Sequence, residues 1–137
     1  MSRESSIQAT ERFGELVNTG RLDAFPEVVA PDCHDHDPAP GQHRGPEGYT
    51  MFFTQLRTAF PDMKVEVEKL VADADSVAFA YTLTGTHQGD FNGHAPTGKA
   101  IKVRGLQIGQ FVDGKMVERW GSSDELGILK QIGVVEG

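Results

Sequence analysis

The chain has 137 residues, a formal net charge of −7 and one cysteine, Cys33, so it can form no internal disulfide. This length predicts one domain, residues 1–137, large enough to bury an apolar core without disulfides or metal. The acidic balance argues against binding to nucleic acid, and no apolar run approaches the roughly 20 residues of a membrane-spanning helix. Because the start of the chain is polar and lacks the apolar stretch of a secretory signal, we expect a cytoplasmic protein with no membrane partner.

Two amphipathic helices are predicted in the first half of the chain. Apolar residues between Ile7 and Val17 recur at helical spacing, and residues 18–20 form a stop signal. Residues 46–60 begin with a proline, which the first helical turn tolerates, and carry an aromatic and aliphatic stripe on one face. We expect this stripe to pack against the core.

A shorter helix and an irregular segment are predicted between these two helices. Asp23 can cap a helix that runs through Val28 and Val29, and Pro31 ends it because proline cannot continue the hydrogen-bond ladder. Residues 33–45 are rich in His, Asp, Pro and Gly, which predicts a brief extended segment followed by a loop.

The apolar period changes to two after the second amphipathic helix, which predicts strands. Alternating apolar and polar residues favour strands over residues 63–68, 77–84 and 101–112, with a turn at residues 73–76. Residues 89–98 contain many chain breakers, so we expect them to form an exposed connection.

A hairpin and a final helix are predicted near the C-terminus. The dipeptide Asp113-Gly114 is typical of a two-residue hairpin turn, so a fourth strand should pair antiparallel with residues 101–112. Ser123 or Asp124 then caps the last helix. This order predicts an α+β fold in which helices cover one face of a curved antiparallel sheet and leave a cavity at its open end.

Five segments resemble the SnoaL-like polyketide cyclases, or ester cyclases, of the nuclear-transport-factor-2-like superfamily. They are HDHDP at 34–38, GPEGY at 45–49, AFPD at 59–62, GTHQGDFNGHAPTGK at 85–99 and DGKMVERWGSSDELGILKQIG at 113–133. The resemblance implies a cone-shaped fold and a homodimeric enzyme, free of metal and cofactor, that closes a ring of an aromatic polyketide by intramolecular aldol condensation. The same fold hosts other reactions and non-catalytic binders, so the fold alone does not fix the reaction.

The resemblance implies acid–base chemistry at Asp124, four residues after Trp120. A carboxylate there can take a proton from a carbon between two carbonyls and return one to the alkoxide, without a metal. Burial against Trp120 would raise its pKa towards neutrality. In the alternative, Asp124 caps the last helix, whose amides hold the carboxylate ionised. The family pattern also implies an assisting histidine on the preceding strand, where this chain has Gln107 and Gln110.

His36 is the second catalytic candidate. If residues 34–37 are extended, His34 and His36 point to the same side, at the rim of the expected cavity. A neutral imidazole at His36 can donate to a substrate carbonyl or relay a proton. Metal binding by the two histidines is a weaker alternative, because further ligands are not evident, and we expect no metal. A histidine that only satisfies its own loop is the other alternative.

The remaining candidates are expected to line the cavity and bind substrate. Aromatic residues at helical or strand spacing serve as core, as pocket wall or as both. Glu118 and Ser122 share strand parity with Trp120, so the three should lie on one face, and a buried Glu118 is a rival general base. The predicted substrate-binding residues are His34, Tyr49, Phe53, Phe79, Gln107, Glu118, Trp120 and Ser122.

Three functions remain open from the sequence. The first is a cyclase, or a related lyase or isomerase, acting on an apolar, carbonyl-bearing small molecule. The second is a hydrolase or hydroxylase of the same fold, and the third is a non-catalytic, dimeric module that binds a small molecule. A buried Asp124 beside a pocket favours chemistry, whereas an exposed Asp124 bonded to amides near Leu126 or Gly127 favours the binding module.

Overall fold

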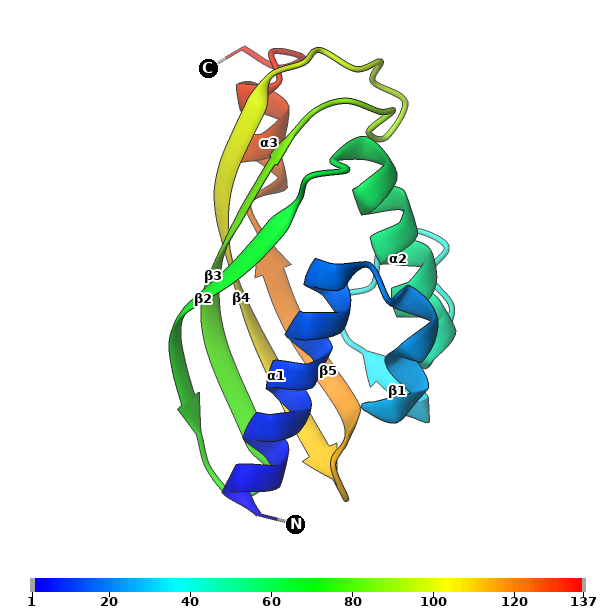
Figure 1. The fold of residues 1–137 in the computed structure, drawn as a ribbon, viewed down its shortest axis with the longest axis vertical. Helices are drawn as coiled ribbons and strands as arrows, with labels where there is room; N and C mark the ends of the chain where they lie inside the picture. Colours follow the sequence, from blue (N-terminus) through cyan, green and yellow to red (C-terminus); the bar gives the residue numbers. More distant parts are fainter. Residues whose placement is uncertain (1, 137) are drawn as a thin grey trace.

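The computed structural model describes residues 2–136, which form helices packed on one side of a five-stranded sheet (Figure 1). In chain order the elements are α1 (Arg3–Thr19), the 3-10 helix η1 (Leu22–Glu27), β1 (Val29–Asp35), α2 (Pro46–Ala59), β2 (Lys64–Ala72), β3 (Ser76–Thr86), β4 (Ala100–Val112), β5 (Lys115–Ser123) and α3 (Glu125–Gln131). The predicted α+β class is therefore confirmed. None of the helices within this part of the chain combines the length and apolar character needed to cross a membrane.

The sheet has the strand order β1-β5-β4-β3-β2 and is antiparallel except at one edge, where β1 runs parallel to β5. The expectation of a wholly antiparallel sheet and of a helix through Val28 and Val29 is corrected here. The helical segment ends at Glu27, and the Met116 amide donates to the Val28 carbonyl at 2.8 Å. Val28 and Val29 are β-branched, which suits a strand. The partner strand, β5, lies far along the chain, so the local spacing of residues did not reveal the pairing.

The two predicted turns between strands are present. Asp113 and Gly114 both have positive φ angles, 52° and 77°, as a tight hairpin turn requires. β2 continues to Ala72, beyond the predicted strand 63–68, and contains a bulge between Val67 and Lys69 that shifts its register. The bulge interrupts the alternation of apolar and polar residues. For this reason the sequence pattern predicted that the strand ends near residue 68.

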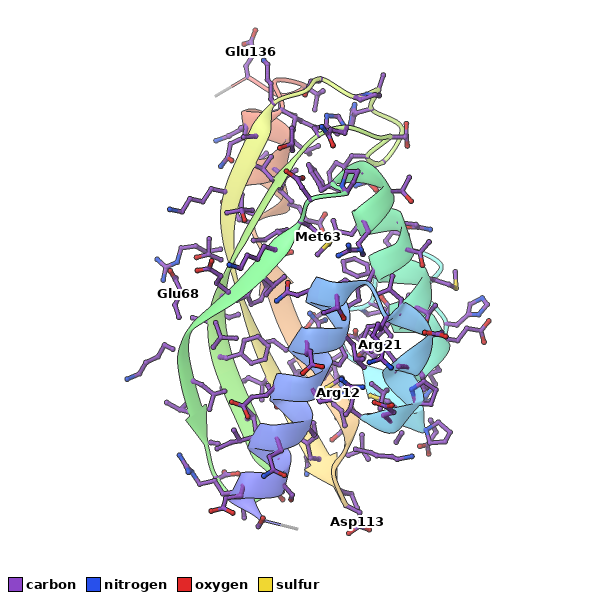
Figure 2. All side chains as sticks on the ribbon, viewed as in Figure 1. Arg12, Arg21, Met63, Glu68, Asp113 and Glu136 are labelled. Carbon is purple, nitrogen blue, oxygen red and sulfur yellow. The ribbon has the colours of Figure 1, made fainter. Side chains whose placement is uncertain are left out.

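Side chains fill the space between the helices and the inner face of the sheet (Figure 2). An aromatic cluster within this core joins α1, η1 and α2. Phe13 of α1 packs against Phe25 of η1 with ring centroids 5.0 Å apart, and edge-on against Tyr49 and Phe53 of α2. Phe25 and Phe60 have no exposed surface. The aromatic stripe of α2 thus holds the helical layer, as the sequence predicted.

Gly45, just before α2, requires its glycine for two reasons. Its φ is +74°, and a β-carbon there would collide with the carbonyl oxygen of Pro31, whereas Gly41 has a similar φ of +76° and open space around it. We expect Gly45→Ala to lower the free energy of unfolding by roughly 3 kcal/mol or more, and Gly41→Ala by about 1–2 kcal/mol, in denaturant titrations. Equal losses for both variants would contradict the role given to the Pro31 contact.

Candidate functional site

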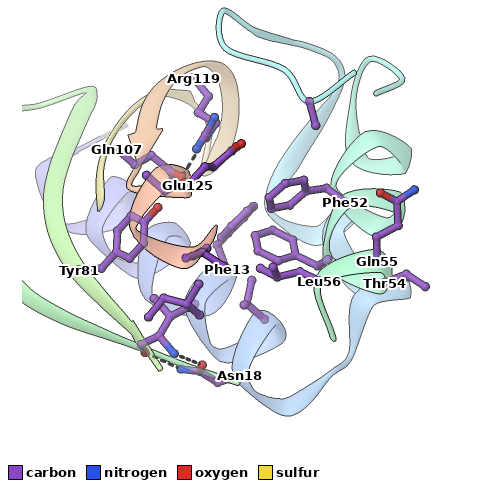
Figure 3. Close-up of a pocket in the computed structure, with 18 of the residues that line it drawn as sticks. Phe13, Asn18, Phe52, Thr54, Gln55, Leu56, Tyr81, Gln107, Arg119 and Glu125 are labelled. Atoms are coloured by element: carbon purple, nitrogen blue, oxygen red, sulfur yellow. Dashed lines mark hydrogen bonds between the residues drawn. The ribbon is translucent and has the colours of Figure 1, made fainter. Parts of the chain in front are cut away.

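A cavity of about 980 Å³ lies between α1, α2 and the inner face of the sheet (Figure 3). Three of the predicted binding residues, Phe53, Phe79 and Gln107, line it. The apolar part of the wall consists mainly of Phe13, Val17, Phe52, Phe53, Leu56, Val65, Leu70, Phe79, Leu83, Phe91 and Ile128. Such a cavity suits a largely apolar, flat or aromatic small molecule.

Two glycines on the inner face of β4 and β5 keep this space open. A β-carbon on Gly105 would collide with the phenol of Tyr81, and a β-carbon on Gly121 would collide with the guanidinium of Arg119. The phenol of Tyr81 therefore packs directly on the backbone at Gly105, and the guanidinium of Arg119 packs on the backbone at Gly121. The sheet can thus carry large polar groups at this end without filling the cavity.

The polar end of the cavity is formed by Tyr81, Gln107, Arg119, Ser123 and Glu125. Figure 3 shows Glu125 on the same side of the cavity as Arg119 and Gln107, with Phe52 across from them. Burial raises the pKa of Tyr81, so its phenol remains a protonated donor at neutral pH.

A buried ion pair lies behind this polar end. Nη1 of Arg119 is 3.1 and 3.2 Å from the two carboxylate oxygens of Asp35, and Nε of Arg119 donates to Oε1 of Gln107 at 2.9 Å. The Asp35 carboxylate also accepts from the Tyr49 hydroxyl at 3.1 Å and the Gln42 amide at 3.3 Å. Burial raises the pKa of Tyr49 far above its usual value, so this hydroxyl acts as a donor. Tyr49 was predicted to line the cavity, but its ring packs in the core and its hydroxyl belongs to the hydrogen-bond network of Asp35.

Asp124 caps α3 and does not line the cavity. Its carboxylate accepts from the Gly127 amide at 2.8 Å, and its side chain is exposed. This is the geometry of the capping alternative, while a catalytic role for Asp124 stays a prediction. The next residue, Glu125, does line the cavity, at the end that holds Arg119 and Gln107.

Trp120, Glu118 and Ser122 share a face, as predicted, but it is the face turned away from the cavity. Trp120 lies opposite Ile108 and Ser122 lies opposite Leu106. The expectation that they line the cavity is therefore wrong. The reason is a bulge between Gln110 and Phe111 in the β4–β5 pairing, which shifts the register by one residue and exchanges the faces of the following side chains.

His34 and His36 also lie on this outer face. Their rings are 4.3 Å apart, which confirms that they point to the same side, and the His36 ring stacks on Trp120 at 4.5 Å. Nε2 of His36 is 3.3 Å from the Glu118 carboxylate. Their predicted place in the cavity is corrected, because the β1–β5 register turns Asp35 inward instead. Within residues 2–136, no three His, Cys, Asp or Glu side chains are arranged to hold a metal ion.

Sequence reasoning missed Asp35, Tyr81, Arg119 and Glu125 as site residues. The regular hairpin register set by Asp113-Gly114 would place Trp120 opposite Gln107, on the cavity face. Only the bulge makes Arg119 face inward, and a bulge leaves no clear mark in the sequence here. For Glu125 a signal existed, since a capping residue at position 124 uses its own side chain for the helix and leaves the next acid free.

The chain is similar to proteins of one family over most of its length. The sequence profile of the SnoaL-like polyketide cyclases matches residues 7–132. Aklanonic acid methyl ester cyclase AcmA from Streptomyces galilaeus is 29% identical over 133 residues, which cover 93% of this chain and 90% of AcmA. The solved structure of IdmH from Streptomyces antibioticus, a proposed polyketide cyclase, has a TM-score of 0.82 at 30% identity, covering 93% of this chain and 98% of IdmH. AclR from Streptomyces galilaeus, a proposed hydroxylase, has a TM-score of 0.85 at 27% identity, covering 99% of this chain and 85% of AclR.

The capping role of Asp124 can be measured through stability. Asp124→Ala removes the acceptor for the Gly127 amide and should lower the free energy of unfolding by about 1 kcal/mol, whereas Asp124→Asn retains a capping oxygen and should lose much less. Denaturant unfolding of the two variants beside the wild type tests this. Equal stability of Asp124→Ala and the wild type would mean that the cap contributes nothing.

Proposed function

The chain belongs to the SnoaL-like polyketide cyclase family, and on that premise we propose that it closes a carbon ring in an apolar, polyketide-like small molecule. The observation that carries the proposal is the cavity of about 980 Å³, which has aromatic and aliphatic walls and, at one end, the polar group of Tyr81, Gln107, Arg119, Ser123 and Glu125. The walls would hold a flat substrate by burial, and the polar end would orient its carbonyl oxygens. The name of AcmA, a cyclase of a methyl ester, supports the same substrate class.

The proposed reaction is an intramolecular aldol condensation that stops at the addition product, without loss of water. A base removes the proton from a carbon flanked by two carbonyls, and that carbon attacks a third carbonyl carbon of the same molecule. One carbon–carbon bond forms while the carbon–oxygen π bond opens to an alkoxide. The alkoxide then takes the proton back from the base, so the product is an isomer of the substrate and no co-reactant is consumed.

Glu125 is the carboxylate that we propose as the base. It lines the cavity at the same end as Gln107 and Arg119, and no hydrogen bond or ion pair to another described residue occupies its carboxylate. Asp124, the candidate from the sequence, is the alternative base. To act, its carboxylate would have to leave the Gly127 amide that it now accepts from. His36 would assist only if the outer face contributed to the reaction, since its ring stacks on Trp120 there.

A second candidate function is suggested by the similarity to AclR, a proposed hydroxylase. Glu125 and Gln107 could equally position a water molecule beside a bound carbonyl compound. The mass of the product separates the reactions, because ring closure leaves the mass of the substrate unchanged, hydrolysis adds a water and hydroxylation adds an oxygen atom. Binding without any product would favour the non-catalytic module.

A homodimer is also part of the proposal, through the outer face of the sheet. This face exposes Leu106 and Ile108, with exposed fractions of 63% and 45%. Trp120, His34 and His36 lie beside them on the same face. A contiguous exposed apolar patch is typical of a surface that meets another protein. A second copy would cover it face to face.

Asp124 and Glu125 form a matched pair of neighbouring acids for testing the base. With aklanonic acid methyl ester as the first substrate, we expect Glu125→Gln to bind it but to lose turnover by about a hundredfold or more, as removal of a general base does. Asp124→Asn, which keeps the cap, should retain turnover. Chromatography with mass detection of the product checks both variants. The opposite pattern would assign the base to Asp124.

The dimer surface can be tested with two exposed leucines. Leu106→Glu places a charge in the outer patch and should give a monomer in multi-angle light scattering at micromolar concentration. Leu126→Glu, on α3 and outside the sheet, is the matched control, because Leu126 is comparably exposed, at 53%, and should leave the mass unchanged. A monomeric wild type would exclude the proposed dimer.

A further inference from the structure

Arg119 has hydrogen-bond donors that no described protein group uses. Guanidinium groups carry five N–H donors and no acceptor. Nε of Arg119 donates to Gln107, and Nη1 donates to Asp35, but Nη2 makes no hydrogen bond to another residue of the described chain. Arg119 lines the cavity, and its side chain is 17% exposed. The two N–H groups of Nη2 are therefore available to a ligand.

The same contact fixes which way the Gln107 amide faces. Because Arg119 offers only donors, the atom of Gln107 that lies 2.9 Å from Nε must be the carbonyl oxygen. The amide nitrogen of Gln107 then points away from Arg119, and it too has no acceptor among residues 2–136. Arg119 and Gln107 together present only N–H groups at the polar end.

We propose that Arg119 and Gln107 form an oxyanion site for the carbonyl oxygen that becomes the alkoxide, and that Asp35 is the positioning residue that holds this site. The inference rests on the proposed ring closure, which it deepens. As the new carbon–carbon bond forms, negative charge develops on that oxygen. Fixed donors aimed at it stabilise the transition state more than the ground state.

Asp35 acts through Arg119 and not on the substrate. Its carboxylate is 7% exposed and is surrounded by donors: Arg119, the Tyr49 hydroxyl, the Gln42 amide and the backbone amide of Asp37. No lone pair is left for a substrate proton, so Asp35 is not a base. Its charge balances Arg119 in a site of low dielectric constant, where an unpaired guanidinium would be costly.

The position of Asp35 also explains why β1 is part of the site. Asp35 lies directly opposite Arg119 in the parallel pairing of β1 with β5, 84 residues away along the chain. The ion pair keeps the guanidinium folded across Gly121, where any β-carbon would displace it. Loss of the Asp35 charge would release Arg119, and with it the orientation of Gln107.

Gln107→Glu and Asp35→Asn test the proposal with aklanonic acid methyl ester as substrate. Glu at position 107 can still accept from Arg119, so the thermal midpoint should be kept, but it replaces the free N–H donors by an acceptor. We expect kcat to fall by about a hundredfold or more, as after loss of an oxyanion donor. Asp35→Asn should lower kcat more than it changes KM, measured where the variant is folded.

The control variants remove matched groups outside the site. Gln110→Glu changes the same residue type on the opposite face of β4. Asp62→Asn removes a carboxylate that bonds Thr86 at the surface, away from the cavity. Both controls should retain the wild-type kcat. Wild-type kcat in Gln107→Glu, or in folded Asp35→Asn, would overturn the proposal.

A second readout does not depend on turnover. 2-Naphthol, a flat aromatic phenol, changes its absorption spectrum when it ionises, and an oxyanion site should lower the pKa of the bound phenol. We expect this shift with the wild type and both controls, and its loss in Gln107→Glu and Asp35→Asn. If the pKa of bound 2-naphthol is lowered but the ester is not turned over, the oxyanion site is supported and the proposed ring closure is refuted. No shift with the wild type would overturn the oxyanion site.

Discussion

The bulge between Gln110 and Phe111 is the constraint on which the rest of the site depends. One extra residue in β5 exchanges the two faces of the strand, so that Arg119 and Ser123 face the helices while Trp120 faces outward. A regular register would bury the indole and expose the guanidinium. Trp120 would then take the place of Arg119 at the polar end, and Gln107 would lose the partner that orients its amide.

Turning Arg119 inward creates an electrostatic problem that the neighbouring strands solve. An arginine at 17% exposure loses much of its hydration, and a buried charge is tolerated only when it is paired and hydrogen-bonded. Asp35 supplies the charge and Gln107 supplies a second acceptor. The edge strand β1 is thus more than a cover for the sheet, because the charge at the polar end depends on its parallel pairing with β5.

The cavity adjoins the aromatic cluster that stabilises the helical layer, and Phe13 belongs to both. Glycines at positions 105 and 121 leave room where ligands would bind, at the cost of core packing. The aromatic cluster of Phe13, Phe25 and Tyr49 offsets that loss at the junction of the helices. Tyr49 connects the cluster to the buried ion pair, since its ring packs in the cluster and its hydroxyl donates to Asp35.

The sequence by itself determined the α+β class, the amphipathic helices, the Asp113-Gly114 hairpin and the family, because these follow from local spacing and from motifs. It also predicted that Phe53, Phe79 and Gln107 line the cavity, and that Asp124 lies where a helix needs a cap. Only the tertiary structure decided that β1 runs parallel to β5 and which face of β5 turns inward. Both depend on pairing between distant segments and on one bulge, and side-chain alternation cannot reveal a shift of register by a single residue.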